Sequence, residues 1–186
     1  MGLDLRLNGE FVPGAESWIN LSLLRTREAL DGVQHRGRAR GQSTGGEVRD
    51  VARPTDRLFN LSMFFQDYLR KNKNVRVHLN LTVGSGLPFG IPDNNIVFRN
   101  PYRFEPYHRV DMGFSLLLWK NEWSGRRPNH FLRFTRQTWA GLEVFNMLKV
   151  FNEASNVWIR TVNDIQYAVP NYLTGRRVNL RLRMDF

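Results

Sequence analysis

Apolar and polar side chains alternate without a break along the final stretch of the chain, residues 177–186. The apolar positions are Val178, Leu180, Leu182, Met184 and Phe186, and the polar positions are Arg177, Asn179, Arg181, Arg183 and Asp185. Successive side chains of a β-strand point to opposite faces, so this period of two predicts a strand. One of its faces is wholly apolar and the other is wholly polar.

The same period of two recurs in six earlier segments of the chain. They span residues 3–12, 17–29, 57–69, 75–83, 110–118 and 136–148. In the segment 75–83 the alternation between valine or leucine and polar residues is unbroken. The pattern predicts seven strands in all, each close to the length of about ten residues with which strands cross an outer membrane.

The connections between these strands alternate in length. Those at 13–16 and 70–73 are short, those at 30–55, 84–108 and 149–174 are long, and that at 120–135 is intermediate. Two strand-like pieces at 157–162 and 165–169 predict an extracellular hairpin. Outer-membrane barrels place short turns on the periplasmic side and long loops outside. The sequence therefore predicts an all-β fold, a segment of an antiparallel up-and-down transmembrane β-barrel with its apolar side chains facing lipid.

A barrel of this kind carries its candidate functional groups on the polar, lumen-facing side of its strands. The charged candidates are Arg76, Asp111, Glu143, Arg181 and Arg183. Such groups either contact a plug or a solute, or form a paired and solvated wall. The pattern by itself favours the wall.

The final strand has a second candidate role. An alternating strand that ends on phenylalanine resembles the signal that the assembly machinery of outer-membrane barrels reads. Here that barrel-assembly signal would consist of Val178, Leu180, Leu182, Met184 and Phe186.

A count of seven strands predicts that the whole chain, residues 1–186, is an incomplete barrel. Single-chain bacterial barrels have an even number of strands. An open sheet edge in hydrocarbon would also leave backbone N–H and C=O groups without partners. We therefore expect the remaining strands to come from a removed segment or from another chain.

The composition excludes several classes of function. The formal net charge is +10, with 23 arginines and 4 lysines, and there is no cysteine for a disulfide or a thiolate metal site. No run of about eighteen apolar residues forms a transmembrane helix. The four histidines are widely spaced, and no nucleophile elbow or phosphate-binding motif is present. We expect neither an enzyme nor a bound cofactor or metal.

Four motifs together resemble the C-terminal part of TonB-dependent outer-membrane receptors of the Bacteroidetes, SusC-like type. They are residues 86–90 (GLPFG), 107–114 (YHRVDMGF), 142–148 (LEVFNML) and 167–180 (YAVPNYLTGRRVNL). The resemblance implies uptake of a glycan, a peptide or a metal chelate across the bacterial outer membrane. It implies outer-membrane lipid, the remaining barrel strands, a plug and a SusD-like surface lipoprotein lid as partners. TonB would be reached only through the plug, so the chain is not expected to transport alone.

Two alternatives remain open from the sequence. One is a soluble, basic, antiparallel β-domain that binds nucleic acid or another polyanion, for which the arginine- and glycine-rich residues 34–41 are suited. Its affinity would fall steeply as salt rises, whereas a membrane barrel has no nucleic-acid partner and requires detergent. The other is an interaction subunit whose sheet edges pair with a separate chain.

Overall fold

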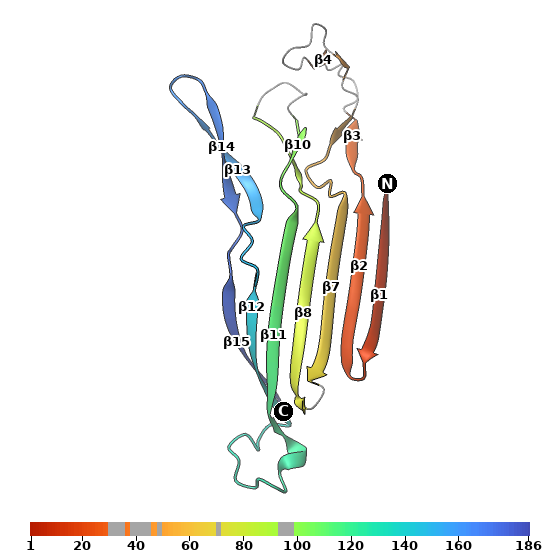
Figure 1. Ribbon diagram of the computed structural model, residues 1–186, viewed down its shortest axis with the longest axis vertical. Helices are drawn as coiled ribbons and strands as arrows, with labels where there is room; N and C mark the ends of the chain where they lie inside the picture. The colour runs from red at the N-terminus through yellow and green to blue at the C-terminus, as the bar shows by residue number, and fades with distance from the viewer. Residues whose placement is uncertain (30–35, 38–45, 48–49, 70–71, 93–98) are drawn as a thin grey trace.

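The chain forms one large antiparallel sheet with up-and-down topology (Figure 1). The computed structural model describes residues 1–29, 36–37, 46–47, 50–69, 72–92 and 99–186. The strands are β1 (Gly2–Val12), β2 (Ala15–Leu24), β7 (Phe59–Leu69), β8 (Asn72–Gly84), β11 (Tyr107–Lys120), β12 (Gln137–Phe145) and β15 (Arg177–Asp185), paired in this order. The predicted all-β, up-and-down segment is therefore confirmed. The sheet is not closed, because within the described residues β1 and β15 each pair with one neighbour.

Smaller elements lie in the connections. They are the strand pairs β3 (Arg27–Ala29) with β6 (Asp50–Ala52), β4 (Arg36–Gly37) with β5 (Gly46–Glu47), β9 (Pro88–Phe89) with β10 (Tyr102–Arg103) and β13 (Glu153–Arg160) with β14 (Gln166–Tyr172), and the 3-10 turn η2 (Asn121–Trp123). The β13–β14 pair is the predicted hairpin, although it begins before residue 157. Among the helices that the structure describes, none has the length and apolar composition to cross a membrane.

Short and long connections emerge at opposite ends of the sheet (Figure 1). At the short-turn end, Val12 pairs with Ala15 across Pro13 and Gly14, and Gly14 adopts a φ of 80° that suits glycine. The described parts of the connections 25–58, 85–106 and 146–176 lie at the other end. The predicted alternation of short and long connections therefore corresponds to the two opposite ends of the sheet. Most of the arginine- and glycine-rich segment 34–41, and of the long loop predicted at 30–55, lies outside the described residues.

The pairing register gathers the alternating leucines, valines, isoleucines and methionines of the seven strands on one face. One row of paired residues runs through Leu7, Ile19, Met63, Leu81 and Val110, and another through Phe65, Leu79, Met112, Val144 and Val178. Register shifts within this sheet occur only at the short-turn end, for example between Tyr68 and Leu69. Because a shift of one residue would exchange the faces, an unshifted centre keeps the apolar face continuous.

This apolar face is exposed. Leu5, Leu180 and Leu182 have exposed fractions of 54%, 81% and 58%, and the described residues contain no second sheet packed upon them. The total accessible surface is 13535 Å², against about 9,300 Å² for a compact soluble monomer of the same mass. The structure is therefore a single layer and not a sandwich with a dry centre.

Two strands are shorter than the sequence pattern predicts. The segment 17–29 was expected to be one strand, but β2 ends at Leu24 and Arg27–Ala29 pairs with β6. The segment 136–148 was also expected to be one strand, but β12 ends at Phe145. Asn146 takes a φ of 50° and donates its backbone N–H to the Asp111 carboxylate at 2.7 Å. In both places polar groups redirect a chain whose pattern would have continued.

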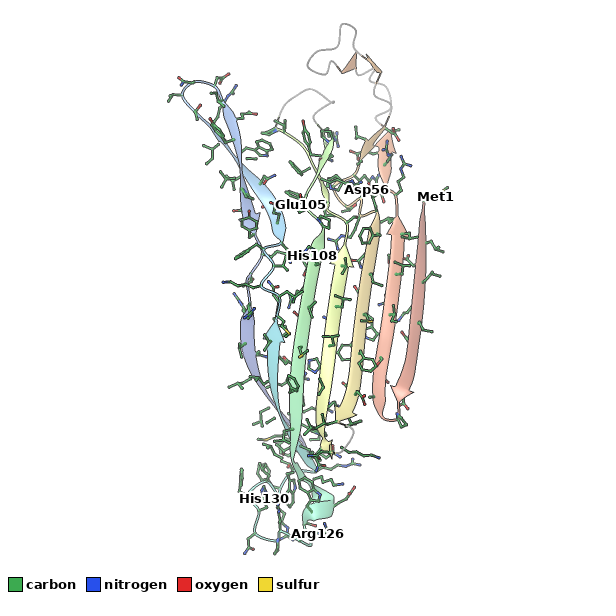
Figure 2. The ribbon with its side chains drawn as sticks, in the orientation of Figure 1. Met1, Asp56, Glu105, His108, Arg126 and His130 are labelled. Carbon is green, nitrogen blue, oxygen red and sulfur yellow. The ribbon has the colours of Figure 1, made fainter. Side chains whose placement is uncertain are left out.

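Two long connections are joined above the sheet by a loop junction of Thr26, Asp56, Gly86 and Arg103. Asp56 lies at the long-connection end (Figure 2) and is 1% exposed. Its carboxylate accepts the Thr26 backbone N–H and pairs with the Arg103 guanidinium, which also donates to the Gly86 carbonyl at 3.0 Å. Burial by itself would raise the pKa of Asp56, but these donors outweigh it and hold the pKa below its ordinary value.

The loop junction is expected to open in acid. A lowered folded-state pKa means that the stabilisation is complete above the ordinary carboxyl pKa of 3.8 and is lost as the pH falls through the lowered value. Hydrogen-exchange protection of the Thr26 amide, corrected for intrinsic rate, should therefore fall only below about pH 4. In Asp56→Asn this protection should be lower at neutral pH and should not change with acid. Equal pH dependence in both proteins would contradict the role of the carboxylate.

Candidate functional site

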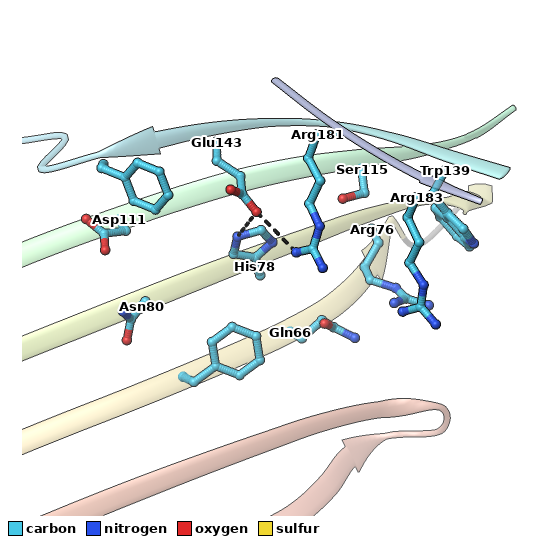
Figure 3. Close-up of a pocket in the computed structure, with 13 residues that line it drawn as sticks. Gln66, Arg76, His78, Asn80, Asp111, Ser115, Trp139, Glu143, Arg181 and Arg183 are labelled. Carbon is cyan, nitrogen blue, oxygen red and sulfur yellow. Dashed lines mark hydrogen bonds and ion pairs between the residues drawn. The ribbon is translucent and has the colours of Figure 1, made fainter. Parts of the chain in front are cut away.

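Polar side chains from five strands surround one depression on the face opposite the apolar side chains (Figure 3). Its volume is about 330 Å³. The residues that line this polar depression are Phe64, Gln66, Arg76, His78, Asn80, Asp111, Ser115, Trp139, Gly141, Glu143, Phe145, Arg181 and Arg183. They meet because strand pairing places Tyr68, Arg76, Ser115, Gly141 and Arg181 in one row and Gln66, His78, Gly113, Glu143 and Asn179 in the next.

The structure brings all five charged residues singled out by the sequence, Arg76, Asp111, Glu143, Arg181 and Arg183, around this depression. That the depression faces a lumen stays a prediction. The residues of the predicted barrel-assembly signal alternate with Arg181 and Arg183, so they lie on the opposite face. Phe186 follows β15, is 83% exposed, and has its ring centroid 6.1 Å from that of Phe134. The signalling role itself also stays a prediction.

Glu143 is the hub of the polar contacts in the depression. Its Oε1 lies 3.5 Å from a guanidinium nitrogen of Arg181 and 3.9 Å from Nε2 of His78, and its Oε2 accepts a hydrogen bond of 3.2 Å from the Asn179 amide. Figure 3 shows the first two contacts converging on the carboxylate from different strands. The Glu143 carboxylate therefore finds its ionic and hydrogen-bonding partners within the sheet itself.

Gly113 provides the space in which the His78 ring lies. His78 and Gly113 are paired residues of β8 and β11, and a Cβ at position 113 would come within 2.1 Å of His78 Cε1. The ring can therefore lie flat across the neighbouring strand and reach Glu143. Any side chain at position 113 would displace it.

Arg76 lies between two aromatic rings. Its guanidinium carbon is 5.0 Å from the centroid of Tyr68 and 4.7 Å from that of Trp139, and one of its N–H groups donates to the Tyr68 hydroxyl at 2.8 Å. Its Nε is buried without a hydrogen-bond partner, and no carboxylate pairs with it within the described residues. Both rings therefore contact the guanidinium, and N–H groups of its terminal nitrogens remain beyond the bond to Tyr68.

Asp111 has a structural role. It is 7% exposed and accepts hydrogen bonds of 2.7 Å from Arg109 Nε and from the Asn146 backbone. Nearby, the Asn152 side chain exchanges hydrogen bonds of 3.0 Å with the backbone of His108. These contacts fasten the connection after β12 onto the start of β11, and Asp111 takes part in them through Oδ1.

A second depression of about 720 Å³ adjoins the first towards the short-turn end of the sheet. Arg76 and Trp139 line both depressions, and Tyr68 lines the second. The stacked arginine therefore stands at the boundary between them. In the described part of the chain, no group of three or more histidine, aspartate or glutamate side chains is placed to hold a metal ion.

The sequence interpretation did not single out His78, Gly113, Tyr68 or Trp139. A signal existed for all four, because each has the parity of a polar residue on its own strand: His78 that of Arg76, Trp139 that of Glu143, Gly113 that of Asp111 and Tyr68 that of Gln66. Parity tells which face a residue shares, but not which residues of other strands it meets. The aromatic pair around Arg76 and the glycine beneath His78 depend on the register between strands.

Gly113→Ala should destabilise the sheet by about 1–3 kcal/mol, because the new methyl group overlaps the His78 ring. In a His78→Ala background the same substitution should cost a small fraction of this, since the obstructing ring is gone. The measurement is a double-mutant cycle of urea unfolding in detergent micelles, followed by tryptophan fluorescence. Additive losses in the double variant would show that the two positions do not compete for space.

Comparison with protein-family models, with curated proteins and with solved structures found no match to this chain. The resemblance to TonB-dependent receptors therefore stays a prediction that rests on the motifs of the sequence.

Proposed function

We propose that this chain forms part of the wall of a transmembrane β-barrel in the bacterial outer membrane, through which a polar solute is taken up. The observation that supports this most directly is the continuous, exposed apolar face of the seven-stranded sheet, opposite a face of paired polar side chains. A lipid-facing exterior and a water-facing interior require this division of side chains.

The strand lengths suit a bilayer. β7 has 11 residues and β8 has 13. At about 3.4 Å per residue and a tilt of about 40°, such strands rise roughly 28–34 Å, which matches a hydrocarbon core of about 30 Å. Moving an exposed leucine side chain from water into lipid would stabilise the protein by about 1.5–3 kcal/mol. In the described structure no second protein layer covers these leucines.

The two edge strands of the sheet, β1 and β15, each have one side without a pairing strand in the described structure. In hydrocarbon the unpaired N–H and C=O groups of β1 and β15 require partners. Closure would come from further strands, supplied by a longer polypeptide or by a second chain. The chain is therefore proposed as one part of a barrel that does not transport by itself.

The narrower proposal is a TonB-dependent receptor that takes up a glycan, a peptide or a metal chelate. It rests on the four sequence motifs that resemble that family. The placement of all long connections at one end, with two of them joined through Asp56 and Arg103, is compatible with an outer surface that captures solute. The expected partners are a plug, outer-membrane lipid and a SusD-like lid, and no catalytic activity is proposed.

Adjacent residues of β8 provide the test. Leu79 lies on the apolar face near the middle of the strand, and Asn80 lines the polar depression. Leu79→Arg should cost about 2–4 kcal/mol in a bilayer, because it places a charge in hydrocarbon, whereas Asn80→Arg adds the same charge to the polar side and should cost far less. The measurement is the fraction of full-length chain that folds into phospholipid vesicles and becomes protected from protease.

The unaltered chain should bind vesicles through its apolar face and require detergent for extraction. Equal folding of the two variants would contradict a lipid-facing role for the apolar face. A chain that stays soluble without detergent and binds DNA with strong salt dependence would instead favour the polyanion-binding alternative.

A further inference from the structure

The polar depression contains three guanidinium groups and few carboxylates to balance them. Arg76 from β8 and Arg181 and Arg183 from β15 all line it (Figure 3). The two lining carboxylates are Glu143 and Asp111, and Asp111 is already occupied by Arg109. Positive charge gathered in a depression raises the local concentration of anions.

Each of the three arginines keeps donors free. Arg181 reaches Glu143 only at 3.5 Å and Arg183 contacts Asp185 at 3.0 Å, with side chains 61% and 59% exposed. A guanidinium carries five N–H groups, so one such contact leaves most of them unused. Arg76 donates to the Tyr68 hydroxyl and has no carboxylate partner in the described residues.

Two aromatic rings contact the guanidinium of Arg76, and the Tyr68 hydroxyl accepts one of its N–H groups. With Tyr68 and Trp139 beside the guanidinium, a ligand that forms hydrogen bonds in the guanidinium plane is favoured. Carboxylate and phosphate oxygens have the spacing that matches this planar fork. A neutral hydroxyl would gain less, because charge-assisted hydrogen bonds are roughly twice as strong as neutral ones.

We infer that Arg76, Arg181 and Arg183 form a seat for an oxyanion, the carboxylate or phosphate group of a small solute that enters the barrel. This inference rests on the proposed function, because the polar face must line an aqueous interior for a solute to reach it. The volume of about 330 Å³ suits a small multivalent anion. The seat lies beside the boundary between the two depressions, where a solute passing along the wall would meet Arg76.

The test is a titration of the full chain, folded in zwitterionic detergent micelles, with citrate and with inorganic pyrophosphate in metal-free buffer. Calorimetry should show saturable binding that weakens with salt, and tryptophan fluorescence should change. The fluorescence change should diminish in Trp139→Phe while heat is still released. Absence of saturable binding of both anions to the folded chain would overturn the inference.

Charge-matched variants separate the seat from general attraction of anions. Arg76→Gln should weaken binding by about tenfold or more, because a charged donor pair is lost. Arg6→Gln removes the same charge from the same face of the sheet on β1, outside the depression, and should leave the affinity within about twofold. Equal losses in the two variants would overturn the inference. If Arg76→Gln does not fold, the anion affinity of Arg183→Gln is compared with that of Arg6→Gln instead, and equal losses would again overturn the inference.

A further arm addresses the source of the oxyanion. An acetylated peptide with two adjacent glutamates represents an acidic segment of a plug. Tighter binding of citrate or pyrophosphate supports a free solute, whereas tighter binding of the peptide overturns that assignment.

The inference and the proposed function fail separately. Vesicle insertion without anion binding overturns the seat alone, and anion binding by a chain that is soluble without detergent overturns the membrane proposal alone.

Discussion

The structure depends on one constraint, that neighbouring strands pair without slipping by an odd number of residues. Side chains alternate between faces at every residue, so one slip would send a strand's leucines to the polar side. The central register is unshifted across all six strand pairs, from the pair of Leu5 with Leu21 to that of Leu142 with Leu180. The register shifts by an odd number of residues only at the short-turn end, beyond the rows of paired residues that carry the two faces.

Consistent register has opposite consequences on the two sides of the sheet. On the apolar side it gathers leucines, valines and phenylalanines, which are similar in size and polarity and pair with one another in rows. On the polar side every contact is specific. His78 lies over Gly113 because the register places them opposite each other, and Arg76 meets Trp139 by the same geometry. The specific side-chain contacts of the sheet therefore lie on its polar face.

Patterns within one strand predicted much of the fold, and interactions between distant segments limited that prediction. The seven long strands, their order and the β13–β14 hairpin followed from alternation and connection length. The ends of β2 and β12 did not, because Asp56 and Asp111 bind backbone N–H groups of residues distant in sequence. Trp119 was expected at the end of a strand and lies in β11, but its hydrogen-bond partner could not be predicted. It is fully buried and donates to the Thr135 carbonyl at 3.0 Å within a connection that has no period.

The sequence by itself determined that the protein is all-β and has one apolar and one polar face, because alternation is a property of each strand alone. It also indicated which charged residues share the polar face. Only the tertiary structure decided that Glu143 would be shared by His78, Arg181 and Asn179, and that Arg76 would lie between Tyr68 and Trp139. These groupings depend on the alignment of separate strands, which arises from pairing energies summed over the whole sheet and is not written in any single segment.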